Sequence, residues 1–180
     1  MRFLENHDEP RAAAVFNDRQ ARAAAVAVAT LPGARLFHEG QFEGRRIRLP
    51  VFLNRRPPEP VDADLQKFYI TLLAAVAQPV FKEGAWRLLE CHGWPDNRSY
   101  LNLTAWTWQL GEERRLIIVN LSGHRSQALI PLPWEDLPGR AWRLTEAFTR
   151  EIYERDGLEL CQPGLFVNLE GWGFHFFRVA

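Results

Sequence analysis

Apolar and polar positions divide the chain into two parts with different periods. In the first part, residues 1–5 and residues 34–38 are short apolar runs of the kind that form buried strands. Residues 18–30 are rich in Ala, and residues 62–77 carry apolar residues at helical spacing. The order strand, helix, strand, helix predicts parallel strands joined by crossover helices. Two such units cannot close a sheet by themselves, so we expect them to be a piece of a larger α/β domain.

Capping residues mark the ends of the two predicted helices. Asn17 precedes the first helix, and Gln20 stands three residues later, as a capping box requires. Either Asp62 or Asp64 can cap the second helix, and Pro79 ends it. We therefore place a boundary at Pro79, with one domain over residues 1–79 and another over residues 80–180.

The second part consists of short segments rich in aromatic and aliphatic residues, separated by Gly, Pro, Asn and Asp. Residues 102–108 alternate polar and apolar side chains, as a half-buried strand does. Six of the seven Trp lie between Trp86 and Trp142, and Trp172 follows. This pattern predicts an antiparallel β-sandwich. We expect strands at residues 86–90, 100–110, 116–121, 127–130, 141–144, 164–169 and 174–179.

Composition excludes several classes of protein. The 180 residues are 47% hydrophobic, which is too apolar for a disordered chain. The 22 basic and 22 acidic residues balance, whereas a nucleic-acid-binding protein normally has a basic excess. The Arg pairs at 45–46 and 55–56 lie in a Gly-, Pro- and Arg-rich loop over residues 40–60, and we interpret them as solvated loop charges. We expect no nucleic-acid partner.

No segment has the length and hydrophobicity of a membrane span, so we expect no membrane partner. Residues 1–5 lack the apolar core of a secretory signal, which favours the cytoplasm. The two cysteines, Cys91 and Cys161, do not make a disulfide framework or a zinc site, and we expect them to be reduced and partly buried. The sequence implies no cofactor.

The first candidate for chemistry is the run from Glu5 to Arg11, Glu-Asn-His-Asp-Glu-Pro-Arg. It gathers amide, imidazole, carboxylate and guanidinium groups at the end of a predicted parallel strand, where α/β barrels collect their ligand-binding groups. A carboxylate there can stabilise developing positive charge. The structural alternative is that Asp8 only caps the following turn, with Pro10 in its first position. Spacing alone leaves both interpretations open.

Residues 3–11 resemble the last conserved segment of the alpha-amylase family of glycoside hydrolases (family 13), in which Asn-His-Asp ends the seventh strand of a (β/α)8 barrel. Residues 30–41, with a Pro-Gly turn, an apolar strand and a Gly followed by Gln, resemble the family's eighth-strand segment. The Trp-rich part resembles the β-domain that follows the barrel. The resemblance covers the whole chain and implies two βα units of an incomplete (β/α)8 barrel followed by an all-β antiparallel sandwich.

The resemblance also implies roles for individual residues. Asp8 would be the third catalytic carboxylate, which grips sugar hydroxyls at the cleavage subsite and stabilises the transition state. His7 would bind hydroxyls of the same sugar, while Asn6 and Arg11 would orient these two side chains. Apart from the resemblance, Glu39 lies beyond the second strand and is a loop charge that either binds substrate or simply faces water.

The resemblance also exposes a shortfall. A retaining glycosidase needs a nucleophile and a general acid/base about 5 Å apart. In the family these groups lie on the fourth and fifth strands, which have no counterpart here. We see nothing in the spacing of Glu39 and Glu43 to make them substitutes. We therefore expect a C-terminal fragment of an enzyme that acts on alpha-glucans by a retaining mechanism, inactive alone, whose partners are the alpha-glucan and the missing barrel segment.

Several alternatives remain open. His38-Glu39 beside His7-Asp8 could hold a metal, although polar rim loops explain the same residues, and we expect no metal site. Cys91-His92 could provide a thiol nucleophile, although a structural role is the better interpretation.

A different class of function is a non-catalytic carbohydrate-binding or interaction module that uses the sandwich aromatics. Trp94 and Trp134 lie next to Pro in loops and are the best candidates for an exposed platform, whereas Trp106 and Trp108 are expected in the core. We also expect exposed sheet edges in the first part to cause self-association or poor packing of the first 80 or so residues.

Overall fold

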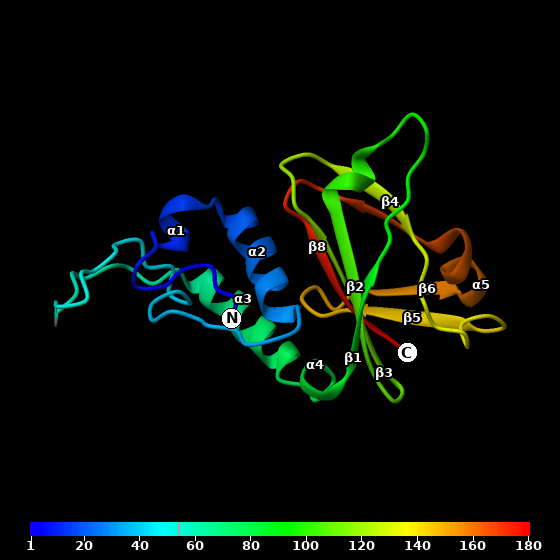
Figure 1. Cartoon of the computed structure of the whole chain (residues 1–180), viewed down its shortest axis with the longest axis horizontal. Helices are drawn as coiled ribbons and strands as arrows, with labels where there is room; N and C mark the ends of the chain where they lie inside the picture. Colours follow the sequence, from blue (N-terminus) through cyan, green and yellow to red (C-terminus); the bar gives the residue numbers. More distant parts are fainter. Residues whose placement is uncertain (54) are drawn as a thin grey trace. The chain divides into compact units, whose positions relative to one another are not determined.

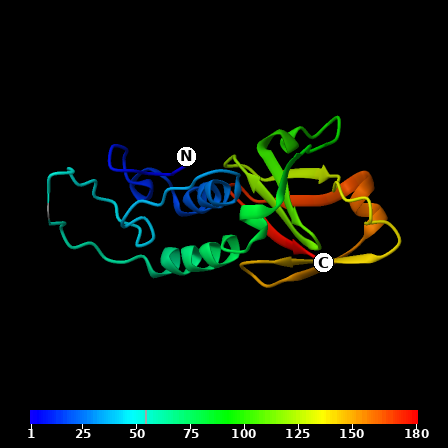
Figure 2. The same ribbon diagram turned by 60° about the horizontal axis from the view of Figure 1, so that its bottom comes forward.

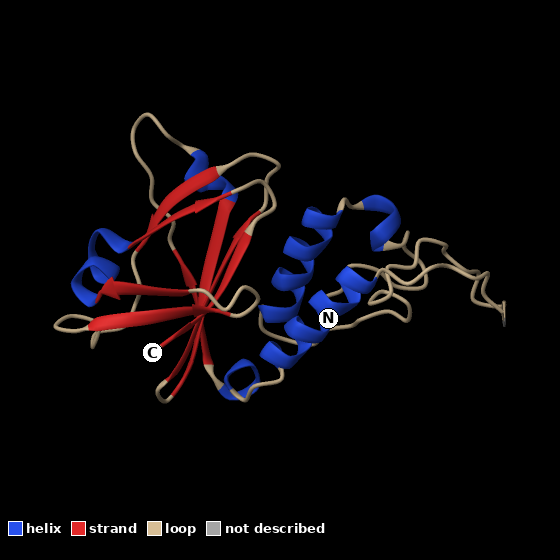
Figure 3. Ribbon diagram, turned by 180° about the vertical axis from the view of Figure 1, so that it is seen from behind, coloured by secondary structure: helices blue, strands red, loops and turns tan. Residues whose placement is uncertain are grey.

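The computed structural model describes residues 1–53 and 55–180, which fall into two compact units (Figure 1). The first unit runs over Met1–Val76 and the second over Ala77–Ala180. Figure 3 shows that helices and loops make up the first unit, while strands dominate the second. No helix in the described ranges is both long and apolar enough to cross a membrane.

Within the described residues, the first unit contains the helices α1 (Ala12–Val15), α2 (Asp18–Thr30) and α3 (Ala63–Val76). The predicted caps are present, because Asn17 Oδ1 accepts a hydrogen bond from the Gln20 N–H at 2.9 Å and Asp62 Oδ1 accepts one from the Leu65 N–H at 2.9 Å. Helices α2 and α3 contact each other. Their buried faces carry small side chains on α2 and larger ones on α3, namely Ala21, Ala23, Ala25, Val26 and Ala29 against Leu65, Phe68, Tyr69, Leu72 and Val76.

The two strands expected over residues 1–5 and 34–38 are shorter in the structure. Each segment pairs at a single position, the parallel bridge Arg2–Arg35. The Arg2 N–H donates to the Ala34 carbonyl and the Leu36 N–H donates to the Arg2 carbonyl, both at 2.9 Å. A short apolar run becomes a strand only where a ladder of backbone hydrogen bonds continues on its neighbours. The predicted parallel direction is therefore present, but the predicted strand lengths are wrong.

The second unit is an antiparallel β-domain with few helices. A six-stranded sheet has the order β1-β2-β3-β8-β5-β6, and a separate two-stranded sheet pairs β4 with β7. All the pairings are antiparallel. The strands are β1 (Ala85–Leu89), β2 (Leu103–Leu110), β3 (Glu113–Asn120), β4 (Ser126–Ile130), β5 (Ala141–Glu146), β6 (Ile152–Asp156), β7 (Leu165–Leu169) and β8 (Phe174–Val179). Short helices are α4 (Val80–Glu83), η1 (Ser99–Asn102), α5 (Gly157–Glu159) and η2 (Leu160–Gly164).

One hydrophobic core lies between these two sheets. It takes Leu116 and Ile118 from β3, Leu144 from β5, and Ile130 and Val167 from the two-stranded sheet, all almost fully buried. Figure 2 shows β4 and β7, in yellow-green and orange, on the other side of this core from β5 and β6. The antiparallel part of the expected fold is confirmed. Strand β6 and helix α4 were not predicted, since neither has a clear apolar period.

The opposite face of the six-stranded sheet is also apolar. Trp106 and Trp108 on β2 are 1% and 5% exposed. Phe81 of α4 packs against the Trp108 ring at 5.8 Å and against Phe176 of β8 at 5.5 Å. Both faces of β2 are therefore covered, and the expectation that these two Trp belong to the core is met.

Candidate functional site

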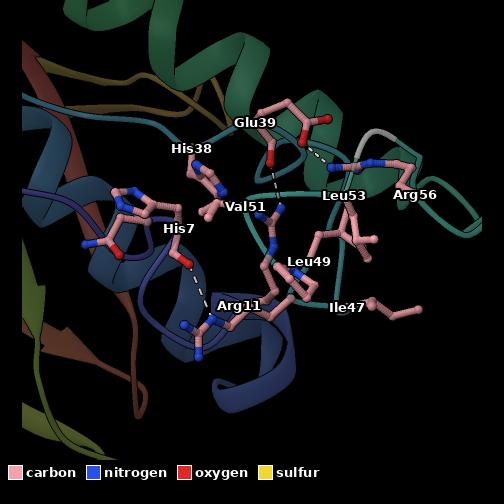
Figure 4. A pocket seen from close by; sticks show the side chains of 12 residues that line it. His7, Arg11, His38, Glu39, Ile47, Leu49, Val51, Leu53 and Arg56 are labelled. Carbon is pink, nitrogen blue, oxygen red and sulfur yellow. Dashed lines mark hydrogen bonds and ion pairs between the residues drawn. The ribbon is translucent and has the colours of Figure 1, made fainter.

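A cleft of about 280 Å³ opens in the first unit (Figure 4). Asn6, His7, His38 and Glu39 line it from the two segments that follow the parallel bridge. Residues 47–53 and Arg56 provide the other wall, with the apolar side chains Ile47, Leu49, Val51 and Leu53 and the cations Arg48 and Arg56. The cleft thus has one polar wall and one wall of mixed apolar and cationic character.

The parallel bridge explains why these two segments meet. His7 follows Arg2 by five residues, and His38 follows Arg35 by three, so both histidines lie beyond the same ends of two parallel segments. Groups at the carboxyl ends of parallel strands collect at one edge of a sheet. The sequence separation of 31 residues between the two histidines is closed by this one pairing.

A tight turn presents His7 and Asp8. The Asn6 Oδ1 accepts hydrogen bonds from the Asp8 N–H at 2.7 Å and from the Glu9 N–H at 3.0 Å. Asn6 therefore caps this turn, the role that the structural alternative gave to Asp8. Asp8 Oδ2 lies 3.2 Å from His7 Nε2, and the two side chains are 75% and 62% exposed. The His7 imidazole thus lines the cleft, and the exposed Asp8 carboxylate lies beside it.

Arg11 and Glu5 form a buried ion pair beneath the turn. Their side chains are 3% and 1% exposed, and Arg11 Nη2 lies 3.1 Å from Glu5 Oε1. Burial raises the pKa of Glu5, and the Ala12 N–H, which donates to Glu5 Oε2 at 2.5 Å, opposes this together with Arg11. Arg11 also donates to the Glu39 carbonyl at 2.8 Å and to the Arg45 carbonyl at 3.3 Å. These contacts hold backbone segments and Glu5. The orienting of His7 and Asp8 by Arg11, which the family resemblance implies, stays a prediction.

His38 and Glu39 lie at the same rim. Burial lowers the pKa of His38, and the Arg11 charge lowers it further, so the imidazole is neutral at neutral pH and can both donate and accept a hydrogen bond. The Glu39 carboxylate is 70% exposed and pairs with Arg56 (Figure 4). Arg48 Nε donates to the His7 carbonyl at 3.3 Å, which links the loop wall to the turn.

The remaining candidates lie elsewhere. Glu43 gives its backbone carbonyl to the Asp62 N–H at 3.0 Å. Burial raises the pKa of Cys91 to about 11, so its thiol stays protonated at neutral pH, and a thiolate nucleophile is not favoured there. In residues 1–53 and 55–180, no group of three or more His, Cys, Asp or Glu side chains could hold a metal ion.

The expected aromatic platform is wrong for Trp134. This side chain is 6% exposed, and the Arg114 guanidinium lies 5.0 Å from its ring. Trp94 is half-buried and packs edge-on against Phe166 at 6.1 Å. Proximity to Pro was a poor guide to exposure, because the loop that carries Trp134 folds back over the core.

Sequence reasoning missed two features of the cleft. The first is the buried role of Glu5, which looked like one of several rim charges. The second is the loop wall, since residues 40–60 were interpreted only as a charged loop. A signal was present, because the odd positions Ile47, Leu49, Val51 and Leu53 are all apolar and all face the cleft.

No protein-family model matches the chain, and no curated protein matches its sequence. Its structure, however, is similar to solved alpha-amylase structures. A noncanonic maltogenic alpha-amylase AmyB from Thermotoga neapolitana matches 98% of this chain with a TM-score of 0.77 and 18% identity. An alpha-amylase from Geobacillus thermoleovorans, complexed with acarbose, matches 99% with a TM-score of 0.72 and 16% identity. The trehalulose synthase MutB from Pseudomonas mesoacidophila matches 99% with a TM-score of 0.62 and 17% identity.

The chain spans only part of these proteins: 40% of the first, 38% of the second and 43% of the third. At these identities the similarity concerns the fold. The expected resemblance to alpha-amylases is confirmed at that level, and the antiparallel β-domain matches their C-terminal domains.

Proposed function

We propose that this chain is the C-terminal part of an alpha-amylase-family enzyme that cleaves or transfers alpha-glucosidic bonds by a retaining mechanism. Residues 1–79 correspond to the last two βα units of an incomplete (β/α)8 barrel, and residues 80–180 to the following β-domain. The fold match supports this assignment, since it covers nearly the whole chain but under half of each solved enzyme. A complete barrel needs roughly 250 residues, more than this chain contains.

The observation that carries the proposal is the exposed contact between His7, which lines the cleft, and the neighbouring Asp8. In this function Asp8 binds hydroxyls of the sugar at the cleavage subsite and stabilises the positive charge of the oxocarbenium-like transition state. His7 binds a hydroxyl of the same sugar, and Asn6 fixes the turn that carries both. The 3.2 Å separation of the carboxylate and the imidazole suits a single sugar edge that offers adjacent hydroxyls.

The second wall of the cleft supports a sugar ligand as well. A sugar ring has polar edges and apolar C–H faces. The polar wall with His7 and Glu39 can bind the edges, and the apolar side chains of residues 47–53 can contact a face. Neutral His38 adds a donor and an acceptor without a net charge.

This chain does not hydrolyse glucan by itself in our proposal. Retaining hydrolysis requires a nucleophile and an acid/base about 5 Å apart across the bond. Asp8 has a different role in the family, and Glu39 is paired with Arg56. The two missing carboxylates are expected on barrel strands encoded upstream of Met1.

The first test reads the DNA upstream of the Met1 codon in the same frame. A coding stretch with an Arg-x-Asp segment followed by a Glu segment supports the proposal. In-frame stop codons directly upstream, together with a promoter, count against it.

The second test measures acarbose binding to the 180-residue chain by calorimetry and by the NMR signals of its histidines. We expect weak binding that moves the His7 and His38 signals. Asp8→Asn should weaken it at least tenfold, while the matched control Asp96→Asn, at an exposed carboxylate of the second unit, should not. Release of glucose from maltoheptaose at an Asp8-dependent rate would show that the chain is active alone.

The expected partners follow from the same proposal. The barrel segment that precedes this chain in the intact protein is one, and a second copy is the other. Exposed apolar side chains in the first unit, such as Val51 at 75% and Phe52 at 79%, support self-association of the isolated chain. Light scattering should show oligomers, and a monodisperse monomer with one cooperative melt would contradict this.

A further inference from the structure

We propose that Glu5 and Arg11 act as a buried positioning pair that holds the two rim segments of the cleft, residues 5–12 and 38–45, in one fixed arrangement. Neither residue is assigned contact with the reacting bond. The proposal depends on the proposed function only for the statement that the cleft receives a sugar.

The first support is the number of segments that one guanidinium joins. Arg11 contacts the Glu5 carboxylate at 3.1 Å, the Glu39 carbonyl at 2.8 Å and the Arg45 carbonyl at 3.3 Å. The last two lie 28 and 34 residues further along the chain. The planar fork of Arg can serve several acceptors at fixed angles, which the single ammonium group of Lys cannot reproduce.

The second support is the backbone at Gly40. Its φ is +81°, and a Cβ at this position would lie 2.6 Å from Arg45 Cγ, 2.7 Å from Arg11 Nη2 and 2.9 Å from Arg56 Nη1. The Arg11 guanidinium is therefore one of three Arg side chains that occupy the space that a side chain at residue 40 would take. The absence of a side chain at Gly40 lets Arg11 approach this part of the rim segment closely.

The third support is that the buried Glu5–Arg11 pair lies where few backbone hydrogen bonds join the extended segments. The first unit has a single parallel bridge between its two extended segments, at Arg2 and Arg35. That bridge lies three residues or more before the groups that line the cleft. Beyond the bridge, the hydrogen bonds from Arg11 to the Glu39 and Arg45 carbonyls link the two segments. Glu5, which also accepts from the Ala12 N–H, holds Arg11 in place through the ion pair.

The consequence is that Glu39 and His38 are positioned through their backbone. Arg11 fixes the Glu39 carbonyl, and the Gln41 side chain accepts from the His38 N–H at 3.2 Å while donating to the Tyr69 hydroxyl at 2.8 Å. Loss of the guanidinium frees the segment on which both rim side chains stand.

One test uses the unaltered chain. The Ala12 amide signal reports ionisation of Glu5, whose charged and titratable neighbours are Arg11, Glu39 and the Tyr69 hydroxyl. During an acid titration followed by ¹H–¹⁵N NMR, we expect the Gly40 amide to move with the same midpoint as Ala12. An Ala12 inflection with no matching change at Gly40 would overturn the proposal.

A second test uses variants and the five histidines. His7 and His38 report the cleft, whereas His92, His124 and His175 belong to the second unit and serve as internal references. Arg11→Met should shift the His7 and His38 signals and leave the three references in place. Arg11→Lys should bring the His7 and His38 signals only partly back to their original positions, because Lys replaces the charge but not the planar guanidinium. Arg114→Lys, at a buried Arg of the second unit, is the matched control and should leave His7 and His38 unchanged.

The outcomes separate the two proposals. If Arg11→Met unfolds the first unit, Glu5→Gln and the titration of the unaltered chain decide the question. Cleft histidine signals that stay in place in a folded Arg11→Met chain refute the positioning pair. If instead these signals respond as expected but acarbose moves none of them, the proposed function fails and the positioning pair stands.

Discussion

The two units differ in what links distant segments of the chain. In the second unit, β2 and β3 pair at eight successive positions, and further ladders extend the sheet to six strands. In the described part of the first unit, the parallel bridge Arg2–Arg35 and the hydrogen bonds from Arg11 to the Glu39 and Arg45 carbonyls connect the extended segments. Where backbone ladders provide long-range order, buried charges make local contacts. Where ladders are nearly absent, a buried guanidinium held by Glu5 connects distant segments.

Buried charges in the second unit illustrate the contrast. Glu146 is 4% exposed and accepts three backbone N–H bonds, from Phe148 at 2.6 Å, Thr149 at 2.8 Å and Phe176 at 3.0 Å. Arg114 lies between two Trp rings, at 5.0 and 4.8 Å from their centroids. Neither charge is the main connection between the strands around it.

The distribution of aromatic residues allows the two units to be followed separately. All seven Trp lie in the second unit, so Trp fluorescence reports its unfolding alone. The longest helices, α2 and α3 with 13 and 14 residues, lie in the first unit and dominate the helical signal at 222 nm. In a urea titration, Trp fluorescence and the 222 nm signal therefore give a separate unfolding midpoint for each unit.

The largest effect is expected for Arg11→Met. It leaves Glu5 buried without its counter-charge, and breaking a buried pair in this way costs about 4 kcal/mol. The midpoint of the 222 nm transition should fall, while that of Trp fluorescence stays. Equal shifts of both signals would mean that the two units unfold together.

A comparable loss in the opposite unit is expected for Leu144→Ala. Leu144 of β5 is fully buried in the core between the two sheets, and truncation there costs about 3 kcal/mol through lost burial and the remaining cavity. Here the Trp fluorescence midpoint should fall and the 222 nm midpoint should hold. Val15→Ala, at a side chain 60% exposed, is the control and should change neither.

Arg114→Met should cost less than Arg11→Met, although both Arg side chains are buried. The partner Asp136 is 51% exposed, and Arg114 Nε and Nη1 have no hydrogen-bond partner. Removal loses mainly the contacts with the Trp rings, about 1 kcal/mol. If Arg114→Met lowers the unfolding free energy followed by Trp fluorescence as much as Arg11→Met lowers the one followed at 222 nm, the two buried guanidinium groups contribute equally. That result would contradict the difference between the two units.

The smallest effects concern pH and should have opposite signs. Because burial raises the pKa of Glu5, its contribution to stability is present below the ordinary pKa of 4.5 and is lost as pH rises through the higher value in the folded chain. In the unaltered chain, the urea midpoint followed at 222 nm should therefore decline as pH rises above 4.5. Glu5→Gln should remove this decline.

For Asp136, the hydrogen bond from Arg114 lowers the pKa of the carboxyl. Its contribution is present above the ordinary value of 3.8 and is lost as pH falls below it. The urea midpoint of Trp fluorescence should fall as pH drops below 3.8. Asp136→Asn should reduce this fall only slightly, since the carboxylate is half exposed. If the urea midpoints of both units changed with pH in the same direction, the roles given to Glu5 and Asp136 would be contradicted.

Local signals in the sequence were sufficient for most of the secondary structure. Asn17 and Asp62 were identifiable as helix caps because their side chains bond to amides three residues away. Seven of the eight strands were expected from short apolar segments between turn residues. Strand β6, with the sequence Ile-Tyr-Glu-Arg-Asp, was missed because it is a polar edge strand stabilised by its neighbour β5.

The sequence by itself determined the two-part organisation, the antiparallel domain and the cluster of polar groups from Asn6 to Arg11, since each depends on residue types and short spacings. Only the tertiary structure decided which of those groups are exposed and which are buried. His7 and Asp8 are exposed while Arg11 is buried, although all three are polar and lie within five residues. That division depends on the carbonyls of Glu39 and Arg45, which approach Arg11 from about 30 residues away, and such distant contacts leave no periodic signal in the chain.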